Sequence, residues 1–268
     1  MTPERELIDL DDCTLSYLRG GSGEPVLFLH GFDGARWSPF FDRLAERYAV
    51  IVPDHPGYGG SSLPPWLRSV HDLAYFYLDV LTELDLPDVH LIGHCVGGWI
   101  ACELAIRQTT NLASLTLIAP AGLRVKGVER ADIFLLSPEK LVRTSYTDQA
   151  LADALLAAAA NDEQADIDAK NRFATARLAW HPRMYDPQLA AWLHRIDVPA
   201  LIAWGADDRI IPPVYADAFA AHIPGAQLAP IAGAGHVPHV ECADALLAQL
   251  LPFLDRRMAV PVAQGAAQ

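Results

Sequence analysis

The sequence has few cysteines and few basic residues, and each scarcity excludes a class of protein. Four cysteines are scattered over 268 residues, with no CxxC pair and no Cys/His ligand spacing. This distribution argues against a disulfide framework and against a zinc site or another metal site. Lys and Arg number 20 against 33 Asp and Glu, for a net charge of −13. Such an acidic protein is a poor match for the phosphates of a nucleic acid, so we expect no nucleic-acid partner.

Long apolar segments are also absent from the sequence. The longest runs, such as residues 117–123 and 154–160, are far shorter than the roughly 20 residues that a membrane helix needs. The first residues are acidic where a secretory signal carries basic ones. We therefore expect a cytoplasmic protein without a membrane partner. Its length fits one large α/β domain, and the sequence leaves open whether it forms a homo-oligomer.

Strand and helix patterns alternate along most of the chain. Apolar runs typical of strands buried on both faces occupy residues 25–29, 49–53, 89–93, 112–120, 199–205 and 227–231. Helical spacing is found in residues 37–48, 70–84, 96–105, 215–222 and 243–254. An antiparallel hairpin is expected over residues 6–18. This alternation predicts an α/β fold with a mostly parallel, doubly wound sheet.

One segment interrupts the alternation. Residues 123–196 are rich in Ala and Leu and contain no strong strand candidate, which predicts a helical cap inserted into the domain. The core would then consist of residues 1–122 and 197–257. Residues 258–268 are expected to form a disordered tail.

The most informative stretch is centred on Cys95. The pattern Gly93-x-Cys95-x-Gly97 joins a strand to a helix and fits the nucleophile elbow, with cysteine in the place usually held by serine. Small flanking residues let the strand and the helix pass closely, and the strained turn lifts the side chain clear of the sheet. The dipole of the following helix favours a thiolate there. Taken alone, the pattern also fits a buried apolar cysteine in an ordinary turn.

Four further motifs occur with this pattern, and together the five resemble the α/β-hydrolase family. They are His30-Gly31-Phe32, the DxPGxGxS-like turn at residues 54–61, the WGxxD segment at 204–208, and the GHxPxxE segment at 235–241. The resemblance implies a triad in the chain order nucleophile Cys95, acid Asp208 and base His236. Asp207 is the alternative acid, but the family spacing selects Asp208.

The resemblance also implies a role for each of these residues. His236 would take the thiol proton and return one to the leaving group, while Asp208 orients the imidazole. The backbone N–H groups of Phe32 and Val96 would form the oxyanion hole. No cofactor or metal ion is implied.

Two residues depart from the common family pattern. The nucleophile is Cys95, a minority choice in this family, and Asp33 stands where many relatives carry proline. In the predicted cap, Trp180, Tyr185 and Trp192 are candidates for substrate contact, although an aromatic residue on an amphipathic helix more often belongs to the core.

The resemblance implies a cofactor-independent hydrolase. It would cleave a carboxylic ester, lactone or thioester of a small, apolar acyl substrate through an acyl-enzyme at Cys95. Three alternatives remain open: an acyltransferase, a carbon–carbon bond hydrolase of ring-cleavage products, and a non-catalytic ligand receptor of the same fold.

Overall fold

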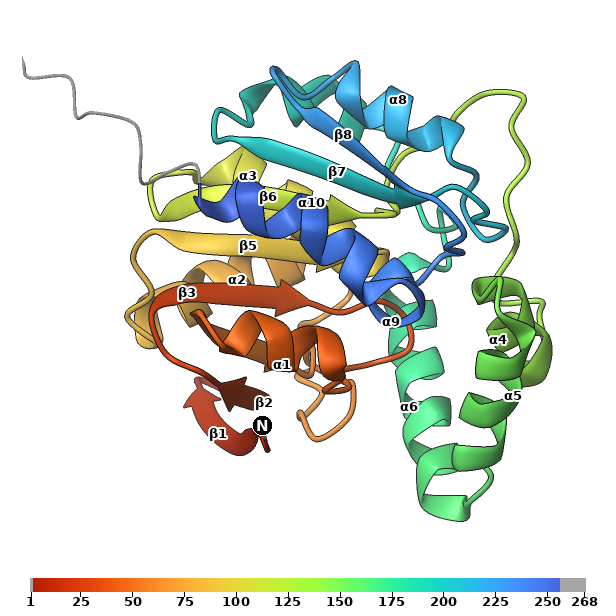
Figure 1. Ribbon diagram of the computed structural model, residues 1–268. Helices are drawn as coiled ribbons and strands as arrows, with labels where there is room; N and C mark the ends of the chain where they lie inside the picture. The colour runs from red at the N-terminus through yellow and green to blue at the C-terminus, as the bar shows by residue number, and fades with distance from the viewer. Residues whose placement is uncertain (1, 256–268) are drawn as a thin grey trace, which may run out of the picture.

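The computed structural model describes residues 2–255, and a single eight-stranded sheet forms its centre (Figure 1). The strands are β1 Glu4–Leu10, β2 Cys13–Gly20, β3 Glu24–Leu29, β4 Tyr48–Pro53, β5 Val89–His94, β6 Leu112–Ile118, β7 Ala200–Gly205 and β8 Gln227–Ile231. Their order in the sheet is β1-β2-β4-β3-β5-β6-β7-β8. The hairpin β1–β2 and the pair β2–β4 are antiparallel, and the other pairs are parallel. The predicted α/β fold with a mostly parallel sheet is confirmed.

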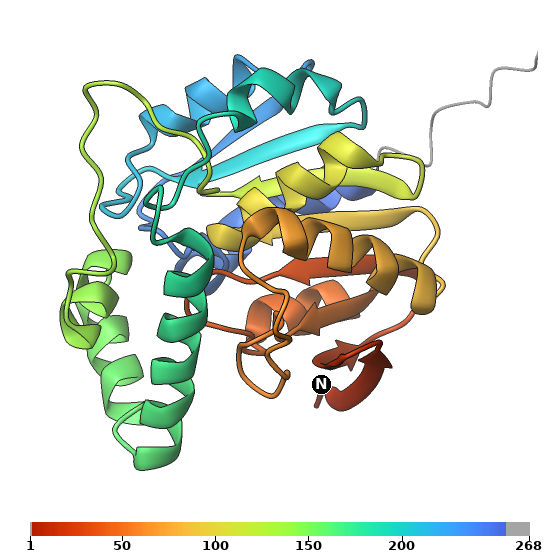
Figure 2. The ribbon, with the colours of Figure 1, turned by 180° about the vertical axis from the view of Figure 1, so that it is seen from behind.

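Helices cover both faces of the sheet. The helices of the described residues are α1 Pro39–Ala45, α2 Val70–Glu83, α3 Val96–Arg107, α4 Pro138–Ser145, α5 Gln149–Ala158, α6 Asp162–Ala179, α7 Leu189–Trp192, the 3-10 helix η1 Leu193–Arg195, α8 Val214–Ala220, α9 Pro238–Glu241 and α10 Ala243–Asp255. In Figure 1, α1 and α10 lie in front of the sheet. The opposite view in Figure 2 shows α2 and α3 on the other face.

Each face of the sheet has its own apolar core, because successive side chains of a strand point to opposite faces. In β3, Leu27 and Leu29 pack into the core that contains residues of α2 and α3, whereas Val26 and Phe28 pack into the core that contains residues of α1 and α10. A strand buried on both sides is apolar at most of its positions. This is why β3 reads as a continuous apolar run rather than as an alternating one.

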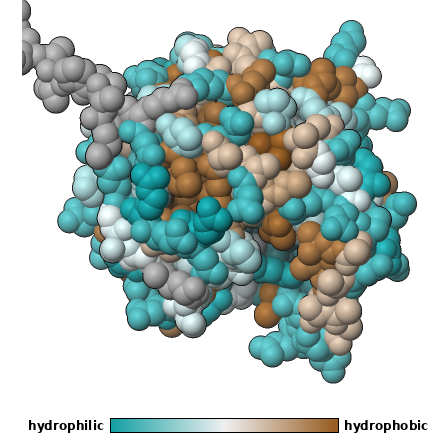
Figure 3. Space-filling model, in the orientation of Figure 1, coloured by the Kyte–Doolittle hydropathy of each residue, from teal (hydrophilic) through white to brown (hydrophobic). Residues whose placement is uncertain are grey.

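The segment between β6 and β7 carries α4, α5 and α6, which project beyond the sheet at the lower right of Figure 1. Figure 3 shows apolar side chains gathered over this part of the molecule. Residues 123–137 lie within the predicted cap but contain no helix. Two glycines with positive φ, Gly122 at 104° and Gly127 at 80°, favour an irregular path there.

Two predictions concern the membrane and the tail. Among residues 2–255, no helix combines the length and the apolar character that crossing a bilayer requires. The tail predicted over residues 258–268 lies outside the described residues.

Candidate functional site

Cys95 occupies a strained turn between β5 and α3. Its backbone has φ 50° and ψ −114°, which is unfavourable for a residue with a side chain. The neighbouring glycines explain the tight crossing. A Cβ on Gly97 would lie 2.1 Å from the carbonyl oxygen of Leu29, and a Cβ on Gly93 would lie 2.4 Å from that of Gly97. The Cys95 amide donates to the carbonyl of Ile118 at 3.0 Å, which helps to hold the turn. The predicted strand, tight turn and helix are present.

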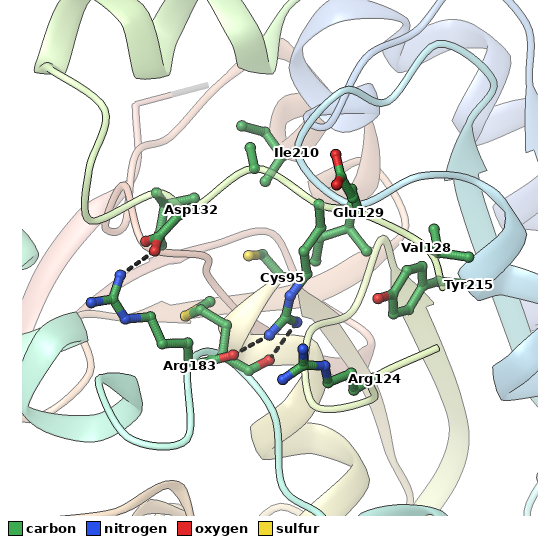
Figure 4. Close-up of a pocket in the computed structure, with 13 residues that line it drawn as sticks. Cys95, Arg124, Val128, Glu129, Asp132, Arg183, Ile210 and Tyr215 are labelled. Atoms are coloured by element: carbon green, nitrogen blue, oxygen red, sulfur yellow. Dashed lines mark hydrogen bonds and ion pairs between the residues drawn. The ribbon is translucent and has the colours of Figure 1, made fainter. Parts of the chain in front are cut away.

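The Cys95 side chain has no surface exposed to bulk solvent. It lines a pocket of about 330 Å³, the polar pocket, which is drawn in Figure 4. The residues that line it are Cys95, Arg124, Val128, Glu129, Arg130, Ala131, Asp132, Ile133, Arg183, Met184, Ile210, Ile211 and Tyr215.

Asp208 and His236 form a buried pair. The Nδ1 of His236 lies 2.8 Å from Oδ2 of Asp208, and both side chains have zero exposure. The same Oδ2 accepts a hydrogen bond from Nε1 of Trp204 at 3.1 Å. Oδ1 accepts from the amides of Ile210 and Ile211 at 2.8 and 2.9 Å. Four donors therefore fix the carboxylate, and the Asp208 carboxylate in turn favours a proton on Nδ1 of His236.

The neighbouring Asp207, which was the alternative acid, is placed differently. It is exposed, and its amide donates to the carbonyl of Ala234 at 3.0 Å. The side-chain hydrogen bond to His236 comes from Asp208. The structure thus brings together Asp208 and His236, as the family spacing predicted, and leaves Asp207 at the surface.

His236 differs electrostatically from the histidines around it. Burial lowers its pKa, but the Asp208 carboxylate and the Cys95 sulfur raise it by more, to about 10. Nε2 of His236 is buried and has no hydrogen-bond partner among the described residues. Burial and the nearby His236 lower the pKa of His94 to about 4, and burial and His94 hold the pKa of His239 well below its usual range. Of these three histidines, His236 is the one whose pKa is raised, which favours its doubly protonated, charged form.

The two amides implied as an oxyanion hole begin or follow regular elements at the same edge of the sheet. Val96 is the first residue of α3, and Phe32 follows β3 in the loop that starts at His30. Neither amide donates to another residue within 2–255. His30 holds the loop, because its Nδ1 lies 2.6 Å from the carbonyl oxygen of Gly31 and its Nε2 accepts from the amide of His55 at 3.1 Å.

A second and larger cavity, the apolar pocket, has a volume of about 590 Å³. Its walls come from the loop after β3 and from the segment that carries α4, α5 and α6. They include Phe32, Asp33, Ile133, Phe134, Leu136, Leu141, Val142, Leu155, Leu156, Ala169 and Val237. Ile133 lines both pockets, and Val237 follows His236 directly. Ile210 and Ile211, whose amides donate to Asp208, line the polar pocket, so chain neighbours of the buried pair contribute to both cavities.

The three aromatic residues predicted to contact substrate lie in different surroundings. Trp180 and Trp192 are 49% and 51% exposed, and neither lines either of the two pockets. Tyr185 lies beside the polar pocket, where the guanidinium groups of Arg124 and Arg130 are 5.3 and 5.6 Å from its ring centre. The sequence analysis did not identify these arginines, because neither of them belongs to a recognisable motif.

One cluster of side chains has the spacing of metal ligands among the described residues, namely His71, Glu103 and Asp186. The Arg107 guanidinium already contacts it, at 2.5 Å from the Glu103 carboxylate and 3.1 Å from Nδ1 of His71. These groups form an ion-pair network in which Arg107 supplies the positive charge.

Comparison with known proteins identifies the family of the chain. The family model described as alpha/beta hydrolase fold matches residues 24–242. The chain is 28% identical over 256 residues to the dihydrolipoyllysine-residue acetyltransferase component of the acetoin cleaving system of Cupriavidus necator. That match covers 89% of this chain and 66% of the relative, so the chain spans about two thirds of that protein. It is 31% identical over 262 residues to the RutD protein of Azorhizobium caulinodans, named as a candidate carbamate hydrolase, with 90% of this chain and 95% of the relative covered.

A solved structure has the same fold. The crystal structure of a membrane phospholipase A, described as a bacterial virulence factor, superposes with a TM-score of 0.82 at 25% identity. The match covers 96% of this chain and 87% of that one. The predicted fold and family are confirmed together, since the family model spans most of the chain and the sheet agrees with it. The chain therefore belongs to the α/β-hydrolase fold family.

Proposed function

We propose that this hydrolase-fold protein cleaves a carboxylic ester, lactone or thioester through an acyl-enzyme at Cys95. The observation that carries the proposal is the buried Asp208–His236 pair, 2.8 Å apart, next to a cysteine held at a strained strand-to-helix turn. Strain of this kind persists where the surrounding structure enforces it, and it is concentrated at functional sites. Cys95, His236 and Asp208 are the proposed nucleophile, base and acid.

The first half of the reaction forms the acyl-enzyme. His236 takes the proton of the Cys95 thiol and leaves a thiolate, because the Asp208 carboxylate and the Cys95 sulfur raise the pKa of His236 to about 10 against the effect of burial. The Cys95 sulfur attacks the carbonyl carbon, and a carbon–sulfur bond forms. The carbonyl oxygen becomes negative and accepts hydrogen bonds from the amides of Phe32 and Val96, each contributing about 3 kcal/mol. As the bond to the leaving group breaks, Nε2 of His236 gives that group its proton.

The second half returns the enzyme to its starting state. Water gives a proton to Nε2 of His236 while its oxygen attacks the thioester carbon. The carbon–sulfur bond then breaks and releases the carboxylic acid and the Cys95 thiolate.

The apolar pocket supports an apolar acyl group as part of the substrate. Nine of the 22 residues that line it are Leu, Val, Ile or Phe, and Phe32 and Val237 connect it to the proposed catalytic residues. We assign the segment at residues 123–196 the role of a cap, because α4, α5 and α6 supply most of these walls. A cytoplasmic location remains a prediction from the sequence.

Acyl transfer is a second candidate function, supported by the burial of the site. Cys95 and His236 both have zero exposure, which restricts the access of bulk water to a thioester. Product analysis with an added alcohol or amine separates the two reactions. Transfer predicts that the new ester or amide is the main product, whereas hydrolysis predicts the free acid.

The direct test of the proposed function is a panel of p-nitrophenyl esters of increasing acyl length. The wild-type chain should release p-nitrophenol, and Cys95→Ala should not. Cys102→Ala is the matched control, because Cys102 is also buried, lies on α3 and does not line either pocket. Activity retained by Cys95→Ala would refute the assignment of the nucleophile. The absence of wild-type turnover over the whole panel would refute ester hydrolysis and favour carbon–carbon bond cleavage or a receptor.

A further inference from the structure

The polar pocket concentrates positive charge in a chain whose net charge is −13. Arg124, Arg130 and Arg183 line it, against the carboxylates of Glu129 and Asp132. Arg183 and Asp132 form an ion pair, which Figure 4 marks by a dashed line. This pair leaves Arg124, Arg130 and Glu129 as the other charged residues that line the pocket.

Arg130 has no carboxylate partner among the described residues. Its guanidinium donates to three backbone carbonyls, those of Leu123 at 3.4 Å, Met184 at 3.0 Å and Arg183. Burial lowers the pKa of Arg130, yet a guanidinium remains charged in a protein. The carbonyls fix the direction of the group without neutralising it. A partly buried cation without a carboxylate beside it favours the binding of an anion in the same pocket.

Arg124 reinforces this charge. Its one hydrogen bond to a described residue is a long contact of 3.5 Å with the hydroxyl of Tyr185. Figure 4 draws the carboxylate of Glu129 pointing away from the Arg124 guanidinium. Arg124 and Arg130 lie close enough for the charge of Arg124 to lower the pKa of Arg130 further, after the larger effect of burial.

Tyr215 provides an independent observation. Its side chain is 1% exposed, and its hydroxyl has no hydrogen-bond partner within the described part of the chain. The residue comes from α8, and Figure 4 shows its hydroxyl directed into the pocket. A buried hydroxyl without a partner is unfavourable, and a bound acceptor would satisfy it.

We infer that the polar pocket binds a carboxylate of the substrate through Arg124, Arg130 and Tyr215. This inference rests on the proposed function and narrows its substrate class to esters or thioesters that carry a second, free carboxylate. Guanidinium and phenol groups are donors to which the oxygens of a carboxylate are well matched. Because Cys95 lines the same pocket and the apolar pocket lies beyond Ile133, the substrate would place its carboxylate on one side of the scissile carbonyl and its hydrocarbon part on the other.

The test compares three esters of similar size. Phenyl pentanoate is neutral, monophenyl glutarate carries a carboxylate on the acyl side, and 4-carboxyphenyl pentanoate carries it on the leaving group. The wild type should prefer one of the anionic esters, and the one preferred assigns the side. In Arg124→Gln and in Tyr215→Phe, the ratio of kcat/KM for that ester to kcat/KM for phenyl pentanoate should fall about tenfold. The control is Arg68→Gln, which removes an exposed arginine that does not line the pocket and should keep the ratio.

A binding measurement separates this inference from the proposed reaction. In a Cys95→Ala background, calorimetry should show monophenyl glutarate or 4-carboxyphenyl pentanoate binding about tenfold more tightly than phenyl pentanoate, with the difference lost on adding Tyr215→Phe. Tighter binding of an anionic ester, combined with the absence of turnover by the wild type, would support the carboxylate site and refute the proposed hydrolase activity. Turnover dependent on Cys95, with equal binding and unchanged ratios in the variants, would keep the hydrolase and overturn the carboxylate site.

Discussion

Replacing Asp208 by Asn changes only one atom of the side chain, but it disturbs all of its contacts. The Asp208 carboxylate accepts four hydrogen bonds, two at each oxygen, from Trp204, His236, Ile210 and Ile211. An Asn side chain keeps one acceptor oxygen and presents an NH2 group to the other two donors. In either orientation of the amide, two of the four N–H groups that donated to Asp208 then face the NH2 group. Where one of these is Nδ1–H of His236, the imidazole can instead move that proton to Nε2.

The size of the effect follows from these contacts. Two lost hydrogen bonds to a charged group, at about 2 kcal/mol each, predict a loss of about 4 kcal/mol in the free energy of unfolding. With the wrong tautomer, kcat falls by up to about 10⁴-fold in serine triads, and we expect a smaller loss here because a thiol needs less help from its base. Asp207→Asn, one residue away and exposed, should change both quantities little.

The assays are p-nitrophenyl ester turnover, chemical unfolding, and an NMR titration of His236. In the wild type the folded pKa of His236 is raised from 6.5 to about 10, so the stabilisation is complete below about pH 6.5 and is lost as the pH rises towards 10. The difference in stability between wild type and Asp208→Asn should therefore shrink over that range. Activity of Asp208→Asn within tenfold of wild type, with a larger loss in Asp207→Asn, would refute our assignment of the acid.

Three further predictions concern the turn, the apolar pocket and the surface. Gly97→Ala should destabilise the fold by about 3 kcal/mol or more, measured by chemical unfolding, because the new Cβ would lie 2.1 Å from the carbonyl oxygen of Leu29; wild-type stability would contradict the close crossing. Ala169→Phe should raise KM for long acyl esters more than for acetate, because it fills the apolar pocket; an unchanged chain-length profile would show that acyl chains bind elsewhere. The hydrogen bond that His71 donates to the Glu103 carboxylate raises the pKa of His71 above 6.5, so the stabilisation from His71 is complete below about pH 6.5 and is lost as the pH passes the folded value. His71→Gln should accordingly lower stability at about pH 6 but much less at about pH 9, and an equal loss at both would exclude this role.

The sequence predicted the sheet well, because strands buried on both faces must be apolar throughout. Residues 227–231 were predicted as a strand with the same limits as β8. Helix ends were less accurate. The helix predicted over residues 37–48 is limited to Pro39–Ala45, because Ser38 is extended with φ −140° and Pro39 is favoured at the first helical position.

The candidate triad could be located from sequence because each of its residues lies in a motif with fixed spacing. Two features of the site could not be predicted from the sequence. The complete burial of Cys95 depends on the walls that a distant segment builds over it. The convergence of Arg130 and Tyr215 on one pocket depends on how the loop before α4 packs against the part of the chain that carries α8, and neither residue belongs to a recognisable motif.

The central claim is that Cys95 carries the acyl group, and trapping that intermediate tests it most directly. The wild-type chain is mixed with p-nitrophenyl butyrate, quenched in acid within the first turnover, digested and mapped by mass spectrometry. Our account predicts one butyryl group on the peptide that contains Cys95, its removal by hydroxylamine as expected for a thioester, and no acylation of Cys95→Ala. Turnover with the butyryl group on another residue, or continued turnover by Cys95→Ala, would contradict it.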